Sequence, residues 1–187
     1  WVETERALGE NNPEIYCEVL LDCGALQALI PEVAASNGIS ALTRAAPHTP
    51  RAVCRWAALL ADLPEARAQQ ASERLRAPSS FSLLAVRVAQ RRTQLKAALK
   101  CGQDCMNVLK ALDALRREEP FGGFCETLAA LEQNSADAVS AVSTLRAACE
   151  AAKTVKAADF SDRGLAGPTL GAAIEAAQIK RISEIIQ

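Results

Sequence analysis

The chain has 187 residues, of which half are hydrophobic but only 4% are aromatic, and its formal net charge is −1. That charge balance excludes a whole-molecule attraction to nucleic acid or to an anionic membrane, although it allows a local basic face. The apolar residues are mainly Ala, Leu, Val and Ile. Because Ala and Leu are strong helix formers, we predict an all-α, multi-helix array with right-angle and antiparallel packing and no significant sheet.

The compartment is predicted from what the sequence does not contain. No apolar run approaches the roughly 18 residues of a membrane span, and no signal peptide is present. The seven cysteines are odd in number and widely spaced, which favours reduced thiols in a cytoplasmic protein over a disulfide framework. The chain opens on Trp1 without a Met, and residues 1–8 already read as helix, so we expect a portion of a longer protein.

The first third of the chain is predicted to hold short helices and one loop. Asn12 can cap a helix that Pro13 opens, and Gly24 ends it. The expected apolar face of this helix is Ile15, Val19, Leu20 and Cys23. A short apolar turn and a short helix from Pro31 follow. Asn, Gly and Pro then mark residues 36–50 as the clearest loop.

Helical spacing of apolar residues predicts the remaining elements. The expected helices cover residues 50–63, 64–76, 81–100, 104–118, 124–133 and 136–153, with a last helix after Pro168. Residues 120–123 are predicted as a turn and residues 157–167 as a weak linker. No internal repeat of fixed period is present.

The sequence offers no recognisable enzyme active site. Its single histidine, His48, lies in the predicted loop and is typical of ordinary surface, so nucleophilic catalysis lacks a base. Cys101 and Cys105 lack the further ligands that a zinc site needs.

A glycine-rich stretch near the C-terminus is the nearest approach to a phosphate-binding loop. Gly164, Gly167 and Gly171 follow no strand, so we predict a turn and a helix start, with phosphate contact through the helix N-terminus as the alternative. Asp159 and Asp162, just before it, are too isolated to predict a metal-binding pair.

Basic residues cluster on the predicted long helix and near it. Arg87, Arg91, Arg92, Lys96 and Lys100 come first, then Arg116 and Arg117, and finally Lys180 and Arg181 on the closing helix. Like charges at helical spacing repel each other, and their segregation in a protein of net charge −1 suits contact with a phosphate backbone. A merely solvated face is the alternative, and cations are also favoured at helix ends. We predict these nine residues as the phosphate-binding set.

The N-terminal residues carry a resemblance to a known family. The matching residues are 1–8, Asn12-Pro13, Tyr16, Val19-Leu20, Asp22-Cys23-Gly24-Ala25-Leu26 and Pro31-Glu32. They closely resemble bacterial CCA-adding enzymes, the tRNA nucleotidyltransferases of the class that also includes bacterial poly(A) polymerases. Residues 164–171 and the closing helix look like the tail of that family, and the region between resembles it in helical pattern only.

The resemblance implies which part of such an enzyme this chain is. The family's catalytic head has a Gly-Ser motif and paired aspartates that hold magnesium and the incoming CTP or ATP, and its neck selects the nucleotide. This sequence contains neither the motifs of the head nor the acidic-plus-arginine motif by which the neck selects the nucleotide. The resemblance therefore places the chain after the head and neck, where members bind tRNA. The expected divisions are 1–35 for the neck or body start, 36–156 for the helical body and 157–187 for the tail. No cofactor is expected in this portion; magnesium, CTP and ATP belong to the parent enzyme.

Some members of the family insert a His-Asp phosphohydrolase domain after a segment like Pro31-Glu32. In this sequence Ala61 stands where the histidine of the His-Asp pair would be, and only Asp62 remains. The region therefore resembles a degenerate His-Asp domain, in which Asp62 is only a polar residue near a helix end.

Three functions remain open. The first is a tRNA-positioning helical portion of a CCA-adding enzyme that transfers CMP and AMP to the tRNA 3′ end, with its own upstream head and neck as further partners and no membrane. The second is a helical scaffold for protein contact or dimerisation. The third is a metal-dependent phosphohydrolase, against which the missing histidines argue.

Overall fold

The computed structural model describes residues 1–163 and 165–186, and within these ranges its regular structure is entirely helical, which confirms the predicted all-α fold. The elements are α1 (Val2–Leu8), α2 (Glu14–Asp22), α3 (Ala25–Leu29), α4 (Pro31–Ala34), α5 (Gly38–Ala45), η1 (Ala46–His48), α6 (Ala52–Leu59), α7 (Glu65–Arg74), α8 (Ser79–Arg91), η2 (Arg92–Gln94), α9 (Leu95–Ala98), α10 (Gly102–Ala111), α11 (Glu118–Leu131), α12 (Ala136–Thr154), η3 (Ala157–Arg163) and α13 (Gly167–Ile186). No described helix is long and apolar enough to cross a membrane.

The N-terminal helices gather around a buried aromatic cluster. Trp56 of α6 is fully buried, and its ring meets that of Trp1 edge to face with centroids 5.3 Å apart. The Trp1 ring also meets Phe81 of α8 at 4.8 Å. The Trp56 indole donates a hydrogen bond to Ser72 Oγ at 3.1 Å. These contacts join the start of α1 to α6, α7 and α8, because a buried Trp must satisfy its N–H while its ring fills the core.

A buried arginine ties the N-terminal segment to the same core. Arg55 of α6 is only 5% exposed, and its guanidinium donates to backbone carbonyls alone. Nη1 reaches the carbonyls of Leu8 and Glu10 at 2.7 and 2.6 Å, Nη2 that of Ala46 at 2.8 Å, and Nε that of Thr49 at 2.7 Å. Burial lowers the pKa of Arg55. One side chain therefore satisfies carbonyls from two separate stretches of chain, residues 8–10 and 46–49.

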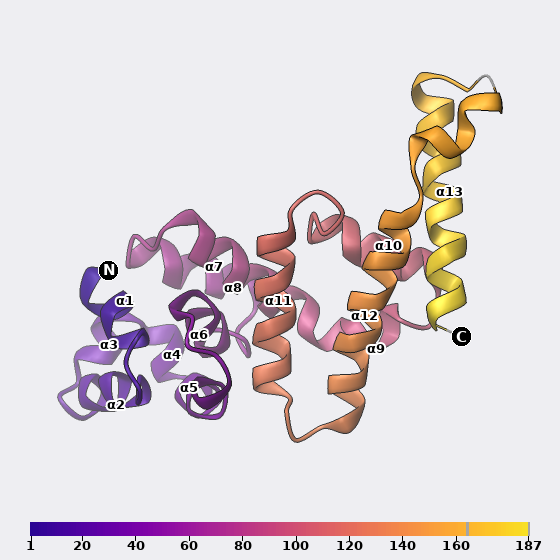
Figure 1. The fold of residues 1–187 in the computed structure, drawn as a ribbon. Helices are drawn as coiled ribbons and strands as arrows, with labels where there is room; N and C mark the ends of the chain where they lie inside the picture. The colour runs from indigo at the N-terminus through magenta and orange to yellow at the C-terminus, as the bar shows by residue number, and fades with distance from the viewer. Residues whose placement is uncertain (164, 187) are drawn as a thin grey trace.

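The C-terminal half is built from longer helices, and Figure 1 shows α12 and α13 as an antiparallel pair that extends away from the N-terminal helices. α13 packs along both α12 and α10. Gly102, at the start of α10, allows this approach, since a Cβ there would lie 3.0 Å from the Ile179 carbonyl oxygen and clash with Ser183 Oγ. Lys110 Nζ pairs with Glu175 Oε1 at 2.5 Å, which adds a polar contact between α10 and α13.

Residues 36–50 are largely helical, so the predicted loop is wrong. Gly38 begins α5, and its N–H is accepted by Ser36 Oγ at 3.1 Å. A Cβ at Gly38 would clash with the carbonyl oxygen of Leu59, so glycine is present here for close packing rather than for a loop. Ala41 and Leu42 are fully buried on the inner side of α5.

The turn predicted at residues 120–123 is also wrong, because these residues lie inside α11. Pro120 is in the first turn of the helix, where the missing N–H costs nothing. Gly123 is buried, and a Cβ there would lie 3.3 Å from Leu84 of α8. Small size at this position therefore lets α11 approach α8.

Two further predictions need correction. The helix expected over residues 104–118 ends at Ala111, and Asp113 adopts the left-handed conformation with φ 54°. The expected apolar face of α2 is not its buried face: Ile15 and Val19 are 52% and 58% exposed, whereas Cys17 is buried.

The seven cysteines all lie in the described ranges as free thiols. Burial raises the pKa of Cys17, Cys105 and Cys125 to about 11, so these thiols are protonated at neutral pH and are poor nucleophiles. Cys101 and Cys23 are exposed. The predicted linker contains η3, while Gly164, the first glycine of the predicted phosphate-contacting turn, lies outside the described residues.

Candidate nucleic-acid interface

The predicted long basic helix is in fact broken. α8 ends at Arg91, residues Arg92–Gln94 form the 3-10 turn η2, and α9 covers Leu95–Ala98. No Gly or Pro occurs in residues 79–100, which is why the sequence did not predict the break. The tighter turn changes the direction in which successive side chains point. The basic residues before and after Arg92 are consequently not one continuous stripe.

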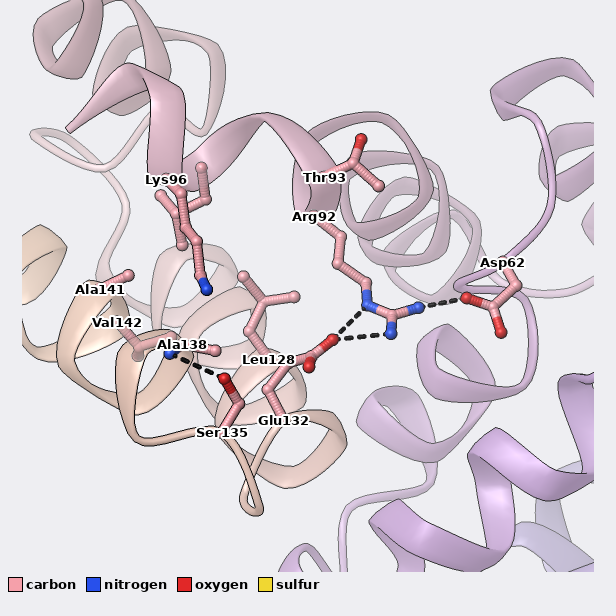
Figure 2. Close-up of a pocket in the computed structure, with 11 residues that line it drawn as sticks. Asp62, Arg92, Thr93, Lys96, Leu128, Glu132, Ser135, Ala138, Ala141 and Val142 are labelled. Atoms are coloured by element: carbon pink, nitrogen blue, oxygen red, sulfur yellow. Dashed lines mark hydrogen bonds and ion pairs between the residues drawn. The ribbon is translucent and has the colours of Figure 1, made fainter. Parts of the chain in front are cut away.

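Arg92 is held between two carboxylates from distant parts of the chain. Its Nε and Nη2 lie 2.7 and 2.6 Å from Oε1 of Glu132, and its Nη1 pairs with Asp62 (Figure 2). Burial lowers the pKa of Arg92, but its hydrogen bonds to Glu132 and the charges of Glu132 and Asp62 outweigh that effect and raise the pKa overall. The Arg92 side chain is 19% exposed and has its acceptors within the protein.

A pocket of about 290 Å³ lies beside this ion-pair bridge, between η2, α9 and the start of α12. Its apolar lining includes Leu95, Leu128 and Val142. Figure 2 shows the Lys96 side chain extending over the pocket towards the start of α12. Lys96 Nζ lies 3.5 Å from Asp137 Oδ2, in an exposed contact that solvent screens. Lys96 therefore remains accessible to an anion.

Arg87 and Arg91 have a different environment from Arg92. They lie four residues apart on α8, hence on one face of it. Nη1 of Arg87 and Nε of Arg91 are buried and find no hydrogen-bond acceptor in the described part of the chain. Burial lowers the pKa of Arg87; the charge of Asp113 opposes this shift and that of Arg117 adds to it. Arg117 and Asp113 are thus close to Arg87.

The remaining predicted residues are exposed and spread over several elements. Arg117 precedes α11, and its Nε pairs with Asp113 Oδ2 at 3.1 Å. Arg116 borders a cleft between α10 and α13. Lys180 and Arg181 border another, between α13 and η3, and Arg181 pairs with Glu184 at 3.2 Å. Lys100 is exposed, and its side chain makes no hydrogen bond or ion pair within residues 1–163 and 165–186.

The structure thus groups the predicted residues in three places: Arg87, Arg91 and Arg117 beside α8; Arg92 and Lys96 at the pocket; and Lys180 and Arg181 on α13. Sequence reasoning missed Glu132, the principal partner of Arg92, since the two are 40 residues apart. It also gave Asp62 no partner, whereas the structure pairs it with Arg92.

The residues of the His-Asp comparison do not come together. Ala61 is buried, His48 is exposed in η1, and Asp62 faces Arg92. Among the residues described, no three His, Cys, Asp or Glu side chains gather in a way that could hold a metal ion.

Comparison with known proteins gives near-complete coverage of the chain. It is 35% identical over 176 residues to a CCA-adding enzyme of Pseudomonas putida strain W619, covering 93% of this chain and 48% of the relative. It is 33% identical over 187 residues to a Multifunctional CCA protein of Pseudomonas putida strain KT2440, covering 97% and 50%. A CCA-adding enzyme of Coxiella burnetii strain RSA 493 is 30% identical over 188 residues, covering 100% and 49%. The chain spans about half the length of these curated relatives. No family model and no solved structure matches it.

Proposed function

The chain is related along nearly its whole length to bacterial CCA-adding enzymes, and from that relationship we propose that it is the tRNA-positioning helical portion of such a nucleotidyltransferase. The observation that carries the proposal is the similarity over 93–100% of the chain to proteins of that name. In the proposed parent enzyme, CMP and AMP are added to the tRNA 3′ end. The magnesium ion and the nucleotides CTP and ATP would be bound by the head, outside this chain.

The distribution of charge supports a role in contacting the RNA backbone. Exposed basic side chains occur before α11 and on α13, and half-buried ones on α8, although the net charge is −1. A phosphate backbone is recognised by such cations largely without regard to base sequence. This portion would therefore grip and orient tRNA while the chemistry takes place elsewhere.

The first test is a titration of this chain with tRNA at several salt concentrations. We expect weak binding whose log affinity falls linearly with log salt, by about 0.9 for each phosphate contact. An unstructured RNA of the same length should bind less tightly, since the proposed role is to position a folded tRNA. Binding that ignores salt, or that is absent at about 50 mM salt where the parent enzyme binds, would contradict the proposal.

A scaffold for protein contact is the second candidate, and one observation favours it. Ile15 and Val19 lie four residues apart on α2 and are 52% and 58% exposed, so one face of this helix presents apolar side chains to solvent. Light scattering on the same samples that are used for the tRNA titration distinguishes the two functions. A chain that self-associates in light scattering and does not bind tRNA would favour the scaffold.

A further inference from the structure

We propose that Arg87 and Arg91 of α8, with Arg117 beside them, form the seat for a backbone phosphate of the bound RNA, and that Arg92 is excluded from it. This inference rests on the proposed function and narrows the nine predicted cations to the cluster that contacts the ligand. The sequence alone predicts instead that all the basic side chains between residues 87 and 100 contact phosphate.

Unsatisfied hydrogen-bond donors distinguish this seat from the other basic groups. Nη1 of Arg87 and Nε of Arg91 are buried, yet no described residue accepts a hydrogen bond from them. A buried donor without an acceptor is costly, and the cost is greater when the group is charged. Both side chains are only partly buried, so an anion at this face of α8 can approach their accessible parts, and a change of rotamer would bring the two buried donors to its oxygens. Planar guanidinium groups suit a phosphate because two N–H groups can point at two of its oxygens.

The acidic groups around the seat are already engaged. Asp113 accepts from Arg117 Nε at 3.1 Å, and Glu119 pairs with Arg51 across the start of α6. Glu118 faces the other way, since its charge acts on the titration of Cys149 and Lys153 of α12. No carboxylate is therefore placed to neutralise both Arg87 and Arg91 among the residues described.

The surroundings leave the seat open to a large ligand. Arg87 borders a small surface pocket between α8 and the start of α11, together with Leu83, Pro120 and Glu119, whose carboxylate is paired with Arg51. Leu83 is 42% exposed, and Arg117 is exposed on the neighbouring loop. Arg92, by contrast, directs its guanidinium at Glu132 and Asp62, so a phosphate there would have to displace an existing ion pair.

The test is a tRNA titration of this chain with Arg87 and Arg91 both changed to Gln. Glutamine keeps much of the aliphatic stem and a polar end but removes the charge. We expect affinity to fall at least about tenfold at moderate salt and the log–log salt slope to become shallower by about 2, one for each lost contact. The matched control is Arg6→Gln with Arg67→Gln, which removes the same charge from exposed positions on α1 and α7.

Each outcome decides the proposal. Lost affinity with a shallower slope, absent in the control, supports the seat. Wild-type affinity and slope in R87Q/R91Q would overturn the seat and leave the proposed function standing, as would an equal loss in the control. Failure of the wild-type chain to bind would overturn both. If circular dichroism shows that R87Q/R91Q is unfolded, R87K/R91K decides: a several-fold loss with an unchanged slope supports the seat, and unchanged affinity overturns it.

Discussion

Neighbouring arginines on this chain have opposite environments. Arg91 has a buried N–H without an acceptor, whereas Arg92, one residue later, bridges Asp62 and Glu132. A residue's position within a helical turn fixes which way its side chain leaves, and the 3-10 turn at Arg92–Gln94 separates the two directions. Charge alone therefore does not distinguish a structural arginine from a ligand-binding one.

Arg92→Ala is expected to destabilise the fold rather than to report on RNA binding. It leaves two carboxylates without their cation in a partly buried site, so we expect the free energy of unfolding to fall by about 1–2 kcal/mol. Urea denaturation measures this. Lys100→Ala is the control, since that exposed residue should change stability by less than about 0.5 kcal/mol. Equal stability of the two variants would show that the Arg92 bridge contributes nothing.

The basic residues could be identified from the sequence, but their roles could not. Arg92 meets Asp62 and Glu132 across 30 and 40 residues, and such pairings depend on how the helices pack. From the sequence, Asp62 could be recognised only as the remaining member of a degenerate His-Asp pair, not as a partner of Arg92.

At the scale of elements, glycine was the main source of wrong boundaries. Gly38 and Gly123 suggest a loop and a turn in the sequence, yet both lie in helices that approach a neighbour closely. Glycine favours turns when left-handed φ is needed, as at Gly24 with φ 76°. It also permits close packing, and a single sequence does not show which reason applies. The apolar spacing that predicted α12 and α13 succeeded because those helices are long and regular.

Substitutions at two adjacent glycines of α11 test whether glycine is present for close packing. Gly122 has open space where a Cβ would be, so Gly122→Ala should raise the free energy of unfolding by about 0.5–1 kcal/mol through better helix propensity. At Gly123 the new Cβ would lie 3.3 Å from Leu84, so Gly123→Ala should gain less or lose stability. Thermal denaturation of both variants compares them. An equal gain would mean that Leu84 does not limit the approach of α11 to α8.

At the scale of the whole molecule, α13 is joined to a helix about seventy residues earlier in the chain by the close approach at Gly102. Gly102→Ala would place a methyl group against Ser183 and the carbonyl oxygen of Ile179. We expect α13 to separate from α10 and its amides to exchange with solvent at least about tenfold faster, because local opening then costs less. Hydrogen exchange measured by mass spectrometry reports this.

Gly171→Ala is the matched control for that experiment. Gly171 lies on α13 with nothing within 4 Å of its Cβ position, so exchange in α13 should be no faster than in the wild type, and alanine's better helix propensity should slow it if it changes at all. Unchanged exchange in Gly102→Ala would show that α13 does not depend on this contact.

The four carbonyls around Arg55 also set how the N-terminal segment responds to acid. Neither a guanidinium nor a carbonyl changes protonation between neutral and acidic pH, so this attachment is the same across that range. The attachment of α4 to α7 is different, because it pairs Glu32 with Arg74. Burial raises the pKa of Glu32, but its hydrogen bonds and the Arg74 charge lower it overall, so the stability it contributes is lost as pH falls through that lowered pKa. At a pH below the ordinary glutamate pKa of 4.5, the chain should therefore loosen between α4 and α7 while residues 8–10 stay attached to α6.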